Sequence, residues 1–219
     1  MTSETSAASW RTRVLPRYLK WFFASQGLNS AFAMITFGSS VFVLYLADLG
    51  LDKARIGFML SLFPFAGLIA PFISGPVSRF GFKRSYLAGY GTRKFVMLFM
   101  LAAPWVLERY GVGVLFAYAA SVIFVFALMR ATAETAYYPW NREFIPDAIR
   151  GRVGGTGSVI AGMCTVAAML ISSLVLRSGT GFGRYQLLIG GACIMGIASV
   201  FICWTMPGVP ASNFIGGSA

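Results

Sequence analysis

The sequence predicts an all-α, polytopic membrane protein, and two observations carry that prediction. Hydrophobic residues make up 57% of the 219 residues and charged residues only 11%. A soluble domain has about 25% charged residues, so most of the surface of this chain is expected to face lipid. Apolar stretches close to the roughly 20 residues that cross a bilayer recur along the chain, with short polar connectors between them. We therefore expect six transmembrane helices.

The chain is expected to have three parts. Residues 1–18 form a Ser/Thr/Ala-rich cytoplasmic tail, residues 19–206 the transmembrane domain, and residues 207–219 a short uncharged tail. The predicted spans are approximately residues 20–47, 56–77, 85–107, 112–138, 153–176 and 187–206. Tryptophans near predicted span ends indicate interfacial belts: Trp10, Trp21, Trp105, Trp140 and Trp204.

The first span has a polar stripe. Gln26, Asn29, Thr36 and Ser40 follow one another at steps that place them on one helical face. Such a stripe faces protein or water rather than lipid. Two interpretations remain open, namely hydrogen bonding to neighbouring helices and the lining of a cavity.

The second span contains Pro64 and Pro71 together with several small residues. Proline inside a spanning helix removes a backbone hydrogen bond and favours a kink, which neighbouring helices must cover. We therefore expect this span to be bent and packed against others.

The third span carries two cations. A helix that begins near Ser85 is long enough to cross, but it places Arg93 and Lys94 inside the predicted membrane segment. Either their side chains extend towards the interface and lipid headgroups, or they face a wet or acidic interior. The first interpretation is favoured.

The fourth span ends in a polar face formed by Arg130, Glu134, Tyr137 and Asn141. Arg130 and Glu134 can neutralise each other as an intrahelical pair. Alternatively, Arg130 attracts an anionic group while Glu134 takes up and releases a proton.

The fifth span has small residues at four-residue spacing, Gly154, Ser158 and Gly162, which predicts a helix contact. A Gly-rich connector then leads to the sixth span, residues 187–206.

Charge sets the expected orientation. The net charge is +11, but the basic residues are spread through connectors rather than gathered on one face, which argues against a nucleic-acid partner. Connectors on the side of the N-terminal tail hold twice as many basic residues as the opposite side. This predicts an integral membrane protein with both termini in the cytoplasm.

Nothing in the sequence predicts an enzyme. The chain has no histidine, its three cysteines are scattered through apolar runs, and Gly179 to Gly183 lacks the lysine of a phosphate-binding loop. No catalytic residue, metal site or cofactor is expected.

Two connectors carry a family resemblance. Ser74, then Ser78 to Arg84, matches the Arg, Gly and terminal basic positions of the signature between spans two and three of major facilitator superfamily transporters, with serine at the signature's Gly and Asp positions. Arg142 to Arg152 is similar to that family's connector before span five. With six predicted spans, the chain resembles the N-terminal half of such a transporter.

The resemblance implies two inverted three-helix repeats, with spans one and four lining the central path. It therefore implies substrate contacts for Gln26, Asn29, Arg130 and Glu134. Arg79, Gly81, Lys83 and Arg84 would set topology, or gate the path by engaging helix C-termini or an acidic partner.

The expected function is a half-size secondary transporter in a bacterial inner membrane. It would move a small solute, anionic if Arg130 binds it, by alternating access. Because the family has twelve spans, the expected partner is a second six-helix half or a homodimer mate. The alternative is a non-transporting structural or assembly subunit of a larger membrane complex.

Overall fold

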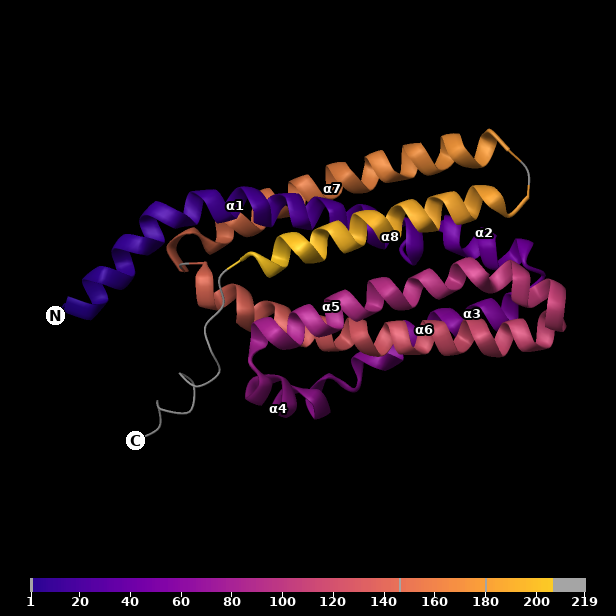
Figure 1. The fold of residues 1–219 in the computed structure, drawn as a ribbon, viewed down its shortest axis with the longest axis horizontal. Helices are drawn as coiled ribbons and strands as arrows, with labels where there is room; N and C mark the ends of the chain where they lie inside the picture. The colour runs from indigo at the N-terminus through magenta and orange to yellow at the C-terminus, as the bar shows by residue number, and fades with distance from the viewer. Residues whose placement is uncertain (1, 146, 180, 207–219) are drawn as a thin grey trace.

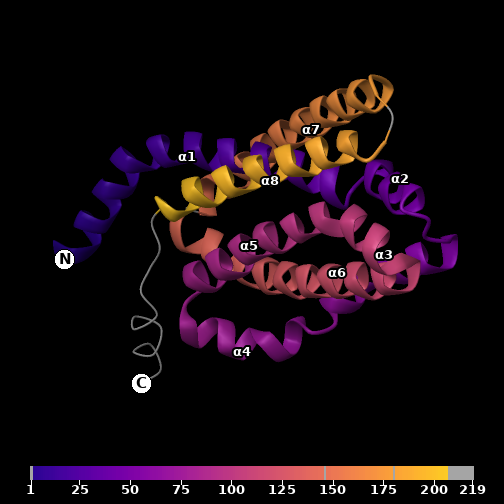
Figure 2. The same cartoon turned by 45° about the vertical axis from the view of Figure 1, so that its right-hand side comes forward.

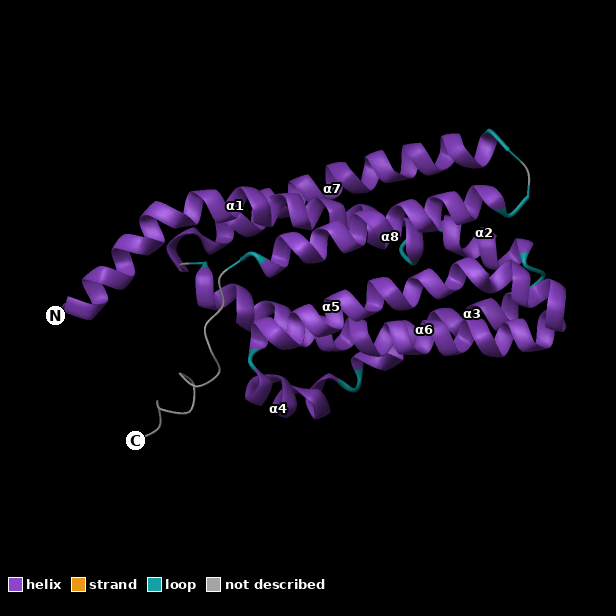
Figure 3. Cartoon of the chain, viewed as in Figure 1, coloured by secondary structure: helices purple, strands orange, loops and turns teal. Residues whose placement is uncertain are grey.

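The described part of the chain is almost entirely helical. A computed structural model describes residues 2–145, 147–179 and 181–206, and their side chains from Tyr18 onward except Glu143 and Phe144. These residues contain helices and no strand (Figure 3). The helices are α1 (Thr2–Thr36), α2 (Ser40–Asp48), α3 (Lys53–Gly67), α4 (Ala70–Phe80), α5 (Phe82–Leu98), the 3₁₀ turn η1 (Phe99–Ala102), α6 (Ala103–Phe144), α7 (Asp147–Arg177) and α8 (Gly183–Trp204).

The helices lie in two groups that run side by side. α1 packs against α7 and α8, while α6 packs against α3, α4 and α5. The contact between α5 and α8 joins the groups, and α4 lies on the outer side of α5 and α6 (Figures 1 and 2). A cavity bounded by α1, α5 and α6 therefore lies where the two groups meet.

Several helical segments are long and apolar enough to span a membrane. By length and composition there are four in the described residues, Tyr18–Asp48, Phe82–Arg142, Asp147–Arg177 and Gly183–Trp204. The pair α3 and α4, bent by 55°, adds a fifth if it counts as one span. These segments support the membrane-protein character of the chain, but they are fewer than the six separate spans predicted.

The difference lies in residues 82–142. This segment is 61 residues long, roughly three times what a bilayer needs, and it includes both the third and the fourth predicted span. At Gly111 the backbone leaves helical geometry, with φ 78° and ψ 177°. Beyond this kink α6 returns along α5 (Figure 1), so the connector predicted at this position is a sharp kink rather than a loop.

Helix boundaries near the first two spans also differ in detail from the prediction. Helix α1 already begins at Thr2, so helical backbone occupies most of the segment predicted as a tail, and a break after Thr36 separates α1 from α2. The second span is bent as predicted, with Pro64 inside α3 and Pro71 in the first turn of α4. The tail predicted over residues 207–219 lies outside the described residues.

One of the tryptophans assigned to an interfacial belt is buried instead. Trp140 is 1% exposed and stacks on Tyr86, with ring centroids 4.9 Å apart, whereas Trp21, Trp105 and Trp204 are exposed. The interfacial prediction is therefore wrong for Trp140, which lies in an aromatic cluster between α5 and α6. The side chain of Trp10 is outside the described residues.

The helix contact predicted for Gly154, Ser158 and Gly162 does not form within the described part of this chain. Gly154 is exposed, and no heavy atom lies within 4 Å of a Cβ added at either glycine. The close approach of α1 to α7 occurs instead at Gly27, where an added Cβ would lie 2.8 Å from Cys164 Sγ. Helical spacing identified a shared face, but a different side of α7 is the one that packs.

Candidate solute cavity

A cavity of about 510 Å³ lies between α1, α5 and α6. The exposed fraction of its lining residues runs from 1% at Tyr90 to 70% at Tyr138, so the cavity reaches from the buried interior to the surface of the chain. Its volume is typical of sites that hold a small molecule. The lining residues are Gln26, Asn29, Ala33, Phe37, Tyr86, Tyr90, Arg93, Arg130, Ala133, Glu134, Tyr137 and Tyr138.

The four residues named as substrate contacts all line this cavity. Gln26 and Asn29 come from α1, and Arg130 and Glu134 come from α6. The structure thus brings together two pairs that are more than 100 positions apart in the chain. Their contact with a solute stays a prediction.

The polar stripe of the first span is divided. The side chain of Gln26 donates a hydrogen bond to the Tyr137 hydroxyl across the cavity. Thr36 is buried and donates to the Phe32 carbonyl of its own helix at 2.7 Å, while Ser40 is exposed at the start of α2. Of the four residues of the stripe, only Gln26 and Asn29 therefore line the cavity.

The helices that carry the cavity approach closely at a glycine. A Cβ added at Gly89 of α5 would lie 2.7 Å from the carbonyl oxygen of Met129 on α6 and 3.0 Å from the Ala133 nitrogen. Glycine at this position therefore lets the two helices pack backbone to backbone. One turn further along α5, this packing places Arg93 in the cavity wall.

Arg93 and Lys94 are buried, which contradicts the favoured interpretation that they extend towards the interface. Arg93 is 5% exposed and Lys94 is fully buried. Both donate hydrogen bonds to the same atom, Asn29 Oδ1, over 2.8 Å from Arg93 Nη2 and 2.7 Å from Lys94 Nζ. Because α5 packs against both α6 and α8, these two side chains lie inside the protein.

The surroundings of the two cations are aromatic rather than acidic. Lys94 Nζ lies 3.4 Å from the Phe32 ring centroid and 4.6 Å from that of Tyr90, and the Arg93 guanidinium lies 4.8 Å from the Tyr90 centroid. Among the described residues neither cation forms an ion pair. Cation–π contacts offset part of the desolvation cost, but they leave the positive charge in place.

Space for Lys94 depends on Gly196 in α8. A Cβ added there would lie 2.9 Å from Lys94 Cδ and 2.9 Å from Phe32 Cδ2. The lysine stem therefore occupies the volume that any other side chain at position 196 would need.

Arg130 and Glu134 form the intrahelical pair that their spacing permits, with Arg130 Nε 2.7 Å from Glu134 Oε1. The two side chains are 31% and 56% exposed, and the Arg130 guanidinium also lies 5.0 Å from the Phe37 ring centroid. The pair therefore forms the outer, wetter part of the cavity wall. Asn141, the last residue of the predicted polar face, is not part of the lining.

The basic turn between α4 and α5 contacts the end of α8. Gly81 has φ 91°, a conformation that favours glycine, and Arg79 and Arg84 are exposed. Lys83 Nζ donates to the Trp204 carbonyl at 3.0 Å and also to the Met206 carbonyl. Lys83 thus engages a helix C-terminus, whose orphan carbonyls favour a cation.

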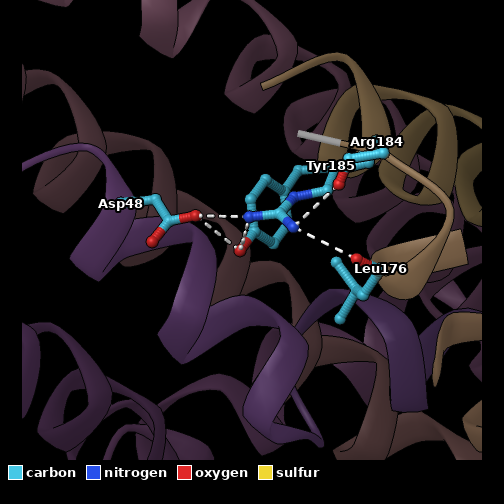
Figure 4. Close-up of polar contacts among 5 residues, drawn as sticks. Asp48, Leu176, Arg184 and Tyr185 are labelled. Carbon is cyan, nitrogen blue, oxygen red and sulfur yellow. Dashed lines mark hydrogen bonds and ion pairs between the residues drawn. The ribbon is translucent and has the colours of Figure 1, made fainter. Parts of the chain in front are cut away.

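The opposite end of the bundle has a neutralised arginine that sequence reasoning missed. Arg184 Nη2 lies 3.0 Å from Asp48 Oδ2, and the Tyr185 hydroxyl donates to the same oxygen at 2.7 Å (Figure 4). Arg184 Nη1 donates to the carbonyls of Leu176 and Gly179, each at 3.1 Å. This cluster links α2 to α8 and caps the end of α7.

Comparisons with family models, with curated proteins and with solved structures give no match for this chain. The interpretation of the cavity therefore depends on its own geometry.

Proposed function

We propose that this chain is one half of a secondary transporter of the major facilitator type and that the cavity between α1, α5 and α6 holds its solute. One observation carries the proposal. Polar residues of two predicted spans, Gln26 and Asn29 with Arg130 and Glu134, converge on a cavity that reaches from the buried interior to the surface. Polar groups at membrane depth cost free energy unless they serve a water-filled or ligand-binding space.

We further propose six crossings arranged as two three-helix repeats. Residues 82–142 would cross twice, turning at Gly111, and the bent pair α3 and α4 would cross once. A broken helix is tolerated at membrane depth where it lies against protein or a cavity. In this arrangement α1 and α6 supply the predicted solute contacts.

The proposed orientation puts the basic turn on the cytoplasmic side of a bacterial inner membrane. Lys83 contacts the end of α8, and the start of α7 lies at the same end of the bundle (Figure 1). The cluster of Asp48 and Arg184 lies at the other end. Grouping Arg79, Lys83 and Arg84 with Arg142, Arg150 and Arg152 at one end supports the positive-inside assignment and keeps both termini cytoplasmic.

A second candidate, a structural subunit of a larger membrane complex, is favoured by the outer face of α7. Only 11% of its apolar window is buried within the chain, and Val159, Met163 and Leu170 are exposed there. Such a face suits close packing against another helix as well as lipid. The mass of the intact particle in mild detergent separates the candidates, since a second half or homodimer favours transport and an unrelated complex favours the subunit.

Cysteine labelling in sealed vesicles tests transport without a known substrate. Cys164, Cys193 and Cys203 are first replaced by serine or alanine, and Ala33→Cys then places one thiol in the cavity lining. Alternating access predicts that a membrane-impermeant maleimide reaches this cavity thiol from either side of the membrane. Tyr110→Cys, at the 57% exposed position beside the Gly111 kink, is the control and should react from one side only. Labelling of the cavity thiol from a single side would contradict the proposal.

A further inference from the structure

We infer that the cavity binds a small organic anion with an aromatic ring, that Arg93 contacts its anionic group, and that Asn29 and Lys94 position Arg93. This inference rests on the proposed function, because it takes the cavity as the solute site. It identifies the class of solute and assigns the principal contact to a residue of the third predicted span.

The charge around the cavity favours an anion. Arg93 and Arg130 line it together with one acid, Glu134, which is already paired with Arg130. Lys94 lies directly behind the wall, on the same amide oxygen as Arg93. With Arg130 paired with Glu134, the positive charge of Arg93 has no counter-ion within ion-pair distance among the described residues. Buried charge without a counter-ion is costly, so an anion that enters the cavity is strongly favoured.

Arg93 has hydrogen-bonding capacity to spare. A guanidinium has five N–H donors, and among the described residues Arg93 donates one hydrogen bond, from Nη2 to Asn29. Its Nε is buried without a partner. The Asn29 oxygen has two lone pairs, and both are taken by the two cations. Arg93 is therefore held in place on one side and left with free donors for a carboxylate or phosphate.

The rest of the lining favours a planar apolar group. Phe37, Tyr86, Tyr90, Tyr137 and Tyr138 all face the cavity, and Tyr86 and Tyr90 stack on each other with centroids 4.7 Å apart. Aromatic walls stabilise an aromatic ring by stacking and edge contacts. An anion with a ring thus matches both halves of the lining, whereas an inorganic anion would match only the charged one.

Equilibrium binding to the full chain tests the inference. The purified protein is placed in nanodiscs of zwitterionic phosphatidylcholine, and radiolabelled benzoate is the probe. Benzoate is expected to bind and to be displaced by phenyl phosphate. Neutral benzamide, which has the same shape, and acetate, which lacks the ring, should each compete at least about tenfold more weakly. Benzamide that competes as well as benzoate would overturn the inference.

Variants locate the contact. Arg93→Gln should weaken benzoate binding roughly 10- to 100-fold, the range for a lost charge-assisted hydrogen bond. Arg93→Lys, which keeps the charge, should retain most of the affinity. Arg109→Gln, an equal change of net charge at an exposed position outside the cavity lining, is the control and should leave it unchanged. Equal affinity in Arg93→Gln and wild type would overturn the assignment. If Arg93→Gln does not fold, the competitor series and Arg93→Lys still decide it.

Two further measurements distinguish a site for a soluble anion from a lipid-headgroup site, and distinguish failure of the anion site from failure of the transport proposal. Part of the phosphatidylcholine is replaced by anionic phosphatidylglycerol, and unchanged benzoate affinity supports a soluble ligand. Loss of benzoate binding there would reassign the site to a lipid headgroup. Binding of benzoate together with one-sided labelling of the Ala33→Cys variant would refute transport and leave the anion site intact. Two-sided labelling without benzoate binding would refute the anion site alone.

Discussion

Arg184 at one end of the bundle and Arg93 in the cavity differ in how their charge is balanced. Arg184 contacts a carboxylate, a hydroxyl, the carbonyl of Leu176 at the end of α7 and the loop carbonyl of Gly179. In the cavity Arg93 and Lys94 share one amide oxygen and have no carboxylate within ion-pair distance among the described residues. Both arginines leave Nε without a partner, so the difference lies in the counter-charge. A cation with a structural role is neutralised locally, whereas the cavity keeps positive charge available.

The strongest test of this comparison is Asn29. Asn29→Leu removes the amide oxygen that accepts from both buried cations, and it should lower the free energy of unfolding by about 3–5 kcal/mol, the cost of stranding buried charge. Equilibrium unfolding in mixed detergent micelles measures it. A loss below about 1 kcal/mol would show that water already hydrates the two cations.

Asn29→Asp changes the same position in the opposite sense. A carboxylate between Arg93 and Lys94 should make the chain more stable than wild type, because it supplies the missing counter-charge. The same charge should abolish benzoate binding. If stability rises while binding persists, the cations have a structural role and the anion is held elsewhere.

The packing of Lys94 gives a smaller effect. Gly196→Ala places a Cβ 2.9 Å from the lysine stem and the Phe32 ring, so overpacking should cost about 1–3 kcal/mol. Gly191→Ala in the same helix is the control, since an added Cβ meets no atom within 4 Å. It should be neutral or stabilising by up to about 1 kcal/mol through helix propensity. Equal effects of the two substitutions would mean that the lysine stem readily moves aside.

Part of the fold and of the candidate site could be predicted from the sequence. Gln26 with Asn29, and Arg130 with Glu134, follow helical spacing, so each pair could be placed on one face without knowing its neighbours. Membrane-protein character followed from composition, and the bend of the second span from its prolines. These features are local, and local chemistry largely determines them.

The environment of Arg93 and Lys94 is not local. It depends on Asn29 and Phe32 from α1 and on the space left at Gly196 in α8, far away in the sequence. Likewise, Arg184 finds Asp48 across 136 positions. Spacing identified the small-residue face of α7 but not whether a helix of this chain would cover it. Sequence pattern thus predicts which residues share a face, and tertiary packing decides what that face meets.

At the end of the bundle where Arg184 pairs with Asp48, removing the cation should have a moderate effect on stability. Arg184→Gln loses the ion pair with Asp48 and the bonds to Leu176 and Gly179. With its side chain 24% exposed, water replaces part of these contacts, and the expected loss is about 1–2 kcal/mol of unfolding free energy. Arg177→Gln, at an exposed position of α7, is the control. Benzoate affinity should not change, and a tenfold loss would mean that the Arg184 cluster and the cavity are coupled.

The smallest effect is expected for the carboxylate at that end. The Asp48 side chain is 42% exposed, and Asp48→Asn keeps an oxygen that can accept from Arg184 and Tyr185, so the loss should stay below about 1 kcal/mol. The difference from wild type should shrink further at high salt, because salt screens an exposed pair. Salt should have a much weaker effect on the instability of Asn29→Leu, since Arg93 and Lys94 are buried. Unfolding measured at low and high salt would therefore distinguish a neutralised surface cation from an uncompensated buried one, and a similar salt response in the two variants would contradict that distinction.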